Sequence, residues 1–152
     1  MPRAGFYTVQ NTPIRLGRDG HWYADDQRIT NRRIAALFSR HVCRGVDGAY
    51  VLRIADEQAL ITVDDTPYVI TGAETDSEGV VWVDLNDGTR ECLDPESLAV
   101  GADEVLYCRV KRGSEPARFL RSAYYQVAQH IARADGGFVF EGPQGRYPIG
   151  RR

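Results

Sequence analysis

The residues with the clearest chemical potential lie in the segment ITVDDTPYVI, residues 61–70. The segment has the character of a strand, with two adjacent carboxylates, Asp64 and Asp65, in its middle. Because side chains alternate along a strand, Asp65 shares a face with Ile61 and Val63. A core-facing Asp65 requires an arginine or several backbone N–H groups, since an unpaired buried carboxylate is costly. Alternatively, the strand breaks at Asp64 and Asp65 caps the turn before the proline.

Two arginines are the candidate partners of Asp65. Arg109 interrupts the strand VLYCRV, in which it shares a face with Tyr107, and Arg121 belongs to the second predicted helix. We predict a buried Asp65–Arg109 pair that joins two halves of the chain. In the competing hypothesis, Asp64 and Asp65 are ligands of a divalent metal ion in a hydrolase, although their spacing does not define a ligand geometry.

The other reactive side chains form no recognisable catalytic or metal-binding motif. The three cysteines are widely spaced without a C-x-x-C pair, so we expect small apolar fillers in a reducing compartment. His41 and His130 fall near the ends of two predicted helices, where the helix dipole favours a histidine. Neither a phosphate-binding glycine motif nor G-x-S-x-G occurs. We therefore expect no catalytic residue, no metal and no cofactor.

Composition and charge are typical of a globular protein. The chain has 152 residues, 43% of them hydrophobic and 26% charged, and its net charge of -2 gives no general attraction to nucleic acid. No apolar run approaches the ~20 residues of a membrane span. The first ten residues, MPRAGFYTVQ, lack the apolar stretch of a signal peptide. We expect a cytoplasmic protein with neither a nucleic-acid nor a membrane partner.

Turn residues place the predicted hairpins. Asp19-Gly20, the segment 86–88 (Asn-Asp-Gly) and the segment 143–145 (Pro-Gln-Gly) each lie between strand-like runs. The polar segment 71–79 is either a long hairpin loop or the boundary between two halves of the chain.

Two helices are predicted from apolar spacing and caps. Thr30 or Asn31 caps the first helix, which ends near Gly45, and Ser114 caps the second, with Pro116 in its first turn. The apolar positions of the first helix are Ile34, Leu37, Phe38 and Val42, and those of the second are Leu120, Ala123, Tyr124, Val127 and Ile131.

The chain shows an internal similarity. RHVCRGVDGAYVL, residues 40–52, aligns with QHIARADGGFVF, residues 129–140, with one gap. The similarity predicts two copies of one unit, which would gain stability by docking against each other. We predict an α+β fold of two related halves, residues 10–72 and 78–150, each a mostly antiparallel hairpin or β-roll motif packed on one main helix.

Several motifs together resemble the bacterial family called domain of unknown function 1285 (DUF1285), and the resemblance covers most of the chain. They are Pro13-Ile14, Asp19-Gly20-x-Trp22, Ile29, Leu37-Phe38, Asp47-Gly48-x-Tyr50-x-Leu52, Ile61-x-Val63-Asp64-Asp65-Thr66-Pro67-Tyr68, and a segment from Arg109 through Arg121 to Tyr124-Tyr125. The resemblance implies an α+β fold of repeated helix-and-strand motifs and a role in signalling or ligand binding. It implies no catalytic residue.

Our leading hypothesis is a non-catalytic regulatory or signalling module that binds a small molecule or a protein. The predicted site is a groove at the junction of the two halves, because pockets favour domain interfaces. Its residues are Trp22, Asp65, Tyr68, Arg109 and Arg121, which would supply aromatic walls, one acceptor and two anion-binding donors. The alternatives are a metal-dependent hydrolase that uses Asp64 and Asp65, and a pure protein-interaction subunit.

Overall fold

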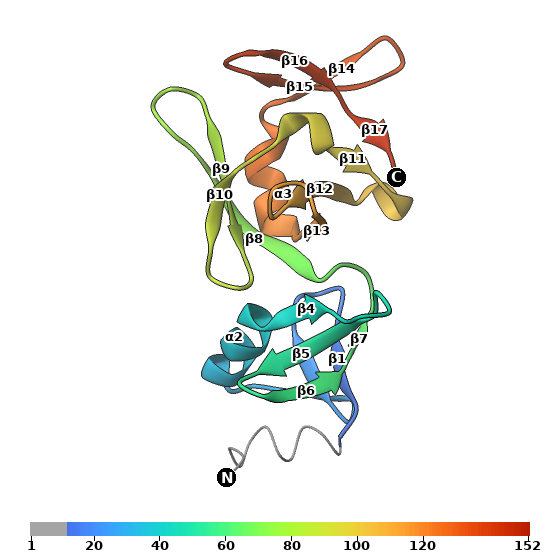
Figure 1. Ribbon diagram of the computed structural model, residues 1–152. Helices are drawn as coiled ribbons and strands as arrows, with labels where there is room; N and C mark the ends of the chain where they lie inside the picture. Colours follow the sequence, from blue (N-terminus) through green and yellow to red (C-terminus); the bar gives the residue numbers. More distant parts are fainter. Residues whose placement is uncertain (1–11) are drawn as a thin grey trace. The chain divides into compact units, whose positions relative to one another are not determined.

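The chain divides into two compact units between Pro67 and Tyr68; residues 12–67 run from blue to green and residues 68–152 from green to red in Figure 1. The computed structural model describes residues 12–152. The first ten residues, for which we expect no signal peptide, and residue 11 of the predicted first half lie outside this range. From the sequence we predict two halves, residues 10–72 and 78–150, with the boundary between them at residues 72–78. The division falls earlier because strand β8 (Tyr68–Thr75) pairs with strands of the second unit.

The first unit contains one α-helix, α2 (Arg32–Arg40), and two small sheets within its described residues. One sheet has the strand order β3-β2-β1-β7 and the other the order β4-β5-β6. The strands are β1 (Ile14–Leu16), β2 (Trp22–Ala24), β3 (Gln27–Arg28), β4 (Val42–Arg44), β5 (Tyr50–Ile54), β6 (Glu57–Leu60) and β7 (Thr62–Val63).

Local signals explain where α2 begins and ends. The side chain of Asn31 accepts hydrogen bonds from the backbone N–H groups of Arg33 and Ile34, as the predicted N-cap requires. The helix ends at Arg40, earlier than the predicted end near Gly45, because Val42 opens strand β4 and pairs with Leu52. The unit has its own core, formed by the buried residues Ile14, Leu16, Trp22, Phe38, Val42, Leu52 and Ile54.

The second unit contains helix α3 (Arg121–Ala128), two 3-10 turns and two sheets. The larger sheet has the order β10-β9-β8-β13-β12-β11-β17, and the smaller one the order β14-β15-β16. The remaining elements are β9 (Val81–Leu85), β10 (Arg90–Cys92), η1 (Pro95–Ser97), β11 (Ala99–Val100), η2 (Ala102–Glu104), β12 (Leu106–Val110), β13 (Glu115–Phe119), β14 (Ile131–Ala134), β15 (Gly137–Gly142), β16 (Gly145–Pro148) and β17 (Gly150–Arg151).

The predicted start of the second helix is wrong, because residues 115–119 form strand β13. Ala117 and Phe119 alternate into the core, and the strand pairs with β12 on one side and with β8 on the other. Pro116 is tolerated because the pairing with β8 begins only at Ala117, so no donor is required of the proline on that side. The helix begins after Leu120, which offers no side-chain cap.

The predicted hairpins are present in the second unit. Asp76 to Gly79 form a short turn between β8 and β9, so the segment 71–79 is a hairpin and most of it belongs to strand β8. Gly88 has φ +88° in the turn between β9 and β10, a conformation that glycine adopts at no steric cost. Residues 143 and 144 join β15 to β16.

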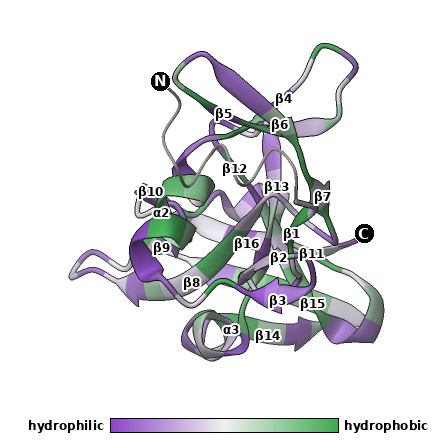
Figure 2. Ribbon diagram, turned by 90° about the horizontal axis from the view of Figure 1, so that it is seen from below, coloured by the Kyte–Doolittle hydropathy of each residue, from purple (hydrophilic) through white to green (hydrophobic). Residues whose placement is uncertain are grey.

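The second unit also has its own core. Ile70, Val83, Leu106, Val110 and Phe119 are buried in it, and α3 contributes Ala123 and Val127. Helices α2 and α3 both carry hydrophobic and hydrophilic residues along their length (Figure 2). Within residues 12–152, the helices are too short and too polar to cross a membrane. The fold is α+β, with two α-helices and mostly antiparallel sheets in the described part of the chain; the parallel pairs are β1 with β7, β8 with β13, and β11 with β17.

Candidate functional site

The two adjacent carboxylates follow a strand that has already ended. Strand β7 stops at Val63, so the alternation of its side chains does not continue to Asp65, and the predicted strand break is the observed conformation. Asp65 is half-buried and Asp64 exposed. The Asp64 carboxylate accepts a hydrogen bond from Arg15 Nη1 at 2.6 Å, and this ion pair raises the pKa of Arg15.

Arg15 neutralises much of the negative charge around Asp64. Its guanidinium lies 4.3 Å from the centre of the Tyr23 ring and 3.7 Å from a carboxylate oxygen of Asp26. A divalent cation bound by Asp64 would have to displace Arg15. Among residues 12–152, no three histidine, cysteine or carboxylate side chains are arranged to hold a metal ion.

Trp22 lies in the core of the first unit. Its side chain is 1% exposed, its Nε1 donates to Ser39 Oγ at 2.9 Å, and its ring meets Phe38 edge-on at 5.4 Å. Buried tryptophans usually find a partner for the indole N–H, and Ser39 fills that role. Trp22 is therefore a core residue and offers almost no surface to a ligand.

Tyr68 lies beside a partly buried ion pair in the second unit. Lys111 Nζ is 5.1 Å from the centre of the Tyr68 ring and 2.6 Å from Asp87 Oδ2. The Asp87 side chain is 7% exposed, and its other oxygen accepts from the backbone N–H and the hydroxyl of Thr89. Burial tends to raise the pKa of Asp87, but the hydrogen bonds from Lys111 and Thr89 outweigh it and lower the pKa.

Arg109 is bound within its own hairpin. Its Nε donates to the carbonyl of Gly113 at 2.7 Å and its Nη2 to the carbonyl of Ser114 at 3.1 Å, so the guanidinium secures the turn between β12 and β13. It also lines a hollow of about 340 Å³ with Tyr107 and Arg152. The predicted Asp65–Arg109 pair spans the two units and stays a prediction.

Arg121 opens helix α3 and lines a groove of about 320 Å³ in the second unit. The groove also contains Arg118, two tyrosines of α3, and the carboxylates of Asp103 and Glu104 from η2, along with Val105, Leu106 and Phe119. Tyr124 and Tyr125 are 37% and 62% exposed, and their ring centres are 5.7 Å apart.

Three charged side chains of this groove, those of Arg121, Asp103 and Glu104, are available to a ligand. No residue in the range 12–152 forms a hydrogen bond or an ion pair with the side chain of Arg121, Asp103 or Glu104. Asp103 and Glu104 have positive φ angles of 57° and 61°. The groove therefore combines two arginines, two carboxylates and an exposed aromatic surface.

Two solved structures have the same architecture. A DUF1285 family protein from Silicibacter pomeroyi DSS-3 superposes with a TM-score of 0.70 at 21% identity, over 90% of this chain and 78% of that chain. A DUF1285 family protein from Shewanella baltica OS155 superposes with a TM-score of 0.61 at 20% identity, over 79% of this chain and 93% of that chain. The chain has the DUF1285 fold. No family model matches the sequence, and no curated protein matches it.

The likeness supports the resemblance to DUF1285 that the sequence motifs suggested, and it carries no activity with it. In this DUF1285 fold the segment Val63-Asp64-Asp65-Thr66-Pro67-Tyr68 ends one unit and opens the next, since the division falls between Pro67 and Tyr68. Trp22 and Asp65 belong to the first unit, whereas Tyr68, Arg109 and Arg121 belong to the second.

Sequence reasoning missed the pair between Asp87 and Lys111. Two signals pointed to it: Lys111 is the only lysine in the chain, and Asp87 stands in the strongest turn motif. The contact nevertheless depends on two hairpins that are 24 residues apart in sequence, and no local pattern specifies it.

Proposed function

We propose that this protein is a cytoplasmic, non-catalytic regulatory module that binds a small molecule in the groove of helix α3. One observation carries the proposal: Arg121, Asp103 and Glu104 line a groove of ligand size without partners among the described residues, next to two exposed tyrosines. Ligand pockets commonly measure about 300–1,000 Å³ and combine apolar walls with a few polar groups.

The charges of the groove indicate the chemistry of the ligand. A guanidinium is suited to a carboxylate or a phosphate, while Asp103 and Glu104 suit an ammonium group. The rings of Tyr124 and Tyr125 offer an apolar surface to the body of the molecule. The best fit is a zwitterion with an aromatic or apolar body, such as an amino acid.

Three related probes test this proposal: phenylalanine, 3-phenylpropanoate, which lacks the amine, and phenethylamine, which lacks the acid. We expect phenylalanine to bind best by isothermal titration calorimetry. Arg121→Gln should lower the affinity for phenylalanine and for 3-phenylpropanoate by roughly fivefold or more, since it removes the charged donor. The same variant should leave the affinity for phenethylamine unchanged.

The matched control is Arg112→Gln, which removes an exposed arginine from the turn between β12 and β13, outside the groove. Equal losses in Arg121→Gln and Arg112→Gln would show that only the general charge of the protein matters. Asp103→Asn should lower the affinity for phenylalanine and phenethylamine, which carry an amine, and leave the affinity for 3-phenylpropanoate unchanged. Failure of all three probes to bind would contradict the proposed ligand class.

A second candidate function is a protein-interaction subunit, which the 62% exposure of Tyr125 favours. Tyrosine and arginine are enriched at the energetic centres of protein interfaces. Tyr125→Ser should then abolish recovery of a defined partner, while Tyr23→Ser, a change on the first unit, should leave it intact. A zwitterion that competes with that partner would favour the small-molecule function instead.

We also propose that the two units are related copies of one helix-and-strand motif. In each unit the helix is followed by a three-stranded antiparallel sheet, β4-β5-β6 or β14-β15-β16. Arg44 pairs across its sheet with Tyr50 and lies 4.6 Å from that ring, and Arg133 pairs with Phe138 at 5.5 Å.

A backbone hydrogen bond supports the same correspondence. The N–H of Arg53 donates to the carbonyl of His41 at 3.0 Å, and the N–H of Glu141 donates to the carbonyl of His130 at 2.7 Å. His41 and His130 are the residues that the sequence alignment matched. If the units are copies, Arg44→Ala and Arg133→Ala should each lower the stability of their own unit, as measured by hydrogen exchange.

A further inference from the structure

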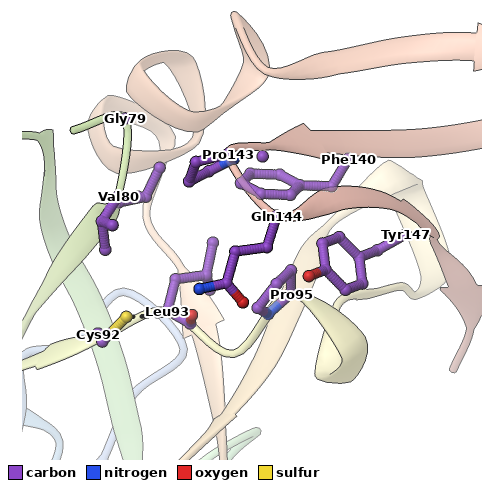
Figure 3. Close-up of a pocket in the computed structure, with 11 residues that line it drawn as sticks. Gly79, Val80, Cys92, Leu93, Pro95, Phe140, Pro143, Gln144 and Tyr147 are labelled. Carbon is purple, nitrogen blue, oxygen red and sulfur yellow. Dashed lines mark hydrogen bonds between the residues drawn. The ribbon is translucent and has the colours of Figure 1, made fainter.

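The second unit contains a pocket of about 140 Å³ that is separate from the groove of α3 (Figure 3). Three segments distant in sequence form its walls: the turn into β9, the end of β10 with the start of η1, and the hairpin of β15 and β16. The lining residues are Gly79, Val80, Val81, Cys92, Leu93, Pro95, Phe140, Gly142, Pro143, Gln144 and Tyr147.

The lining is mostly apolar and carries no charged side chain. Val81, Leu93 and Phe140 are 4%, 5% and 3% exposed, so the floor of the pocket is continuous with the core of the second unit. An ionised ligand would lose its hydration there without gaining a counter-charge. The pocket therefore selects an uncharged molecule.

Aromatic side chains and one amide determine which chemical groups a ligand of this pocket should carry. Phe140 and Tyr147 form one wall, with ring centres 6.5 Å apart and tilted by 48°. Figure 3 shows the side chain of Gln144 extending from the Phe140 side of the pocket toward Leu93 and Pro95, with its amide between these two residues. No described residue hydrogen-bonds to that amide, which leaves its two N–H donors and its carbonyl acceptor for a ligand.

The walls are held in place before any ligand arrives. The N–H of Leu93 donates to the carbonyl of Val81 at 2.9 Å, and Asp76 Oδ1 accepts from the N–H of Val80 at 3.0 Å. At Gly142 a Cβ atom would meet the Phe140 ring at 3.0 Å, so glycine permits the close approach of that ring. Preformed walls reduce the entropic cost of binding.

The volume indicates the size of the part of a ligand that the pocket can enclose. An apolar cavity of about 150 Å³ is large enough to hold benzene. We propose that this pocket binds an uncharged molecule with a single six-membered ring and one hydrogen-bonding substituent, the ring against Phe140 and Tyr147 and the substituent on the amide of Gln144. This site is independent of the α3 groove, so either proposal can fail alone.

Phenol is the probe for this pocket, and benzoate, with a similar ring and a full charge, is the comparison. Carbon-13 methyl spectra of the full chain should show saturable phenol shifts at Val80, Val81 and Leu93. Benzoate should bind at least about tenfold more weakly. Gln144→Ala should lower the affinity for phenol. It should leave the affinity for toluene unchanged, because toluene has no polar substituent.

Val80→Phe fills the pocket and should abolish the phenol shifts at Val81 and Leu93. Its matched control is Glu78→Phe, which adds the same ring to the same turn on an exposed side chain outside the pocket. The control should bind phenol like the parent protein. The proposal would be overturned if Val80→Phe and Glu78→Phe bound phenol equally well. It would also be overturned if benzoate bound as tightly as phenol, or if phenol produced no saturable shifts.

Cys92 supplies a readout that does not depend on spectra. It lines the pocket and is exposed, whereas Cys43 lies in the first unit and serves as an internal reference. Saturating phenol should slow alkylation of Cys92 and leave the rate at Cys43 unchanged. Equal slowing of both cysteines, or no slowing of Cys92, would refute occupancy of the pocket.

Discussion

Replacing Lys111 by methionine should destabilise the second unit because it leaves Asp87 without its cationic partner. Methionine keeps an unbranched apolar side chain near the Tyr68 ring but removes the donor 2.6 Å from Asp87 Oδ2. Breaking a fully buried ion pair costs about 3–5 kcal/mol. Lys111 is 29% exposed and Thr89 continues to donate to Asp87, so we expect about 2 kcal/mol.

The two tryptophans provide a way to observe this unit by itself. Trp82 lies in the second unit and Trp22 in the first, so a Trp22→Phe background reports unfolding of the second unit through Trp82. A loss of 2 kcal/mol in a unit of this size lowers the Tm by about 8–16 °C. The control is Arg90→Met, which breaks an ion pair with Asp84 whose side chains are 48% and 37% exposed, and it should lower the Tm far less.

The effect should also depend on pH in a defined direction. The pKa of Asp87 is lowered in the folded protein, so its pairing stabilises fully above the ordinary aspartate pKa of about 3.9 and is lost as the pH falls through the lowered value. The difference between the parent protein and Lys111→Met should therefore narrow below about pH 4. The assigned role of the Asp87–Lys111 pair would be refuted if Arg90→Met lowered the Tm as much as Lys111→Met does. It would also be refuted if the Tm difference between the parent protein and Lys111→Met stayed constant below about pH 4.

Three further outcomes follow from single contacts. Ser39→Ala should cost the first unit about 1–2 kcal/mol, because the indole N–H of Trp22 loses its buried acceptor; hydrogen exchange confined to the first unit checks this. Asn31→Ala should cost about 1 kcal/mol by removing the N-cap of α2, measurable as faster exchange in that helix, whereas Asn31→Gly should cost only a few tenths. Burial raises the pKa of Cys108 to about 12, so a thiol reagent at pH 8 should label Cys92 and leave Cys108 unmodified until the protein unfolds; prompt labelling of Cys108 would contradict its burial.

Some features of this protein are specified locally, and the sequence was sufficient to predict them. Asn31 caps α2 because its side chain reaches backbone donors two and three residues away. The Asn-Asp-Gly turn joins β9 to β10 because Gly88 supplies the positive φ angle that the turn needs. The α+β class and the resemblance to DUF1285 follow from many such local patterns together, and the solved structures support both.

Contacts between distant segments were decided only by the tertiary structure. Residues 115–119 resemble a helix start locally, yet they form a strand because β8 and β12 offer partners on both sides. Trp22 could have lined a site, but Ser39 and Phe38 enclose it in a core. The pair of Asp87 and Lys111, the open charges around Arg121 and the pocket beneath Gln144 arise from hairpins that meet in space. Local propensity acts over a few residues, whereas burial and charge pairing depend on which surfaces the folded chain brings together.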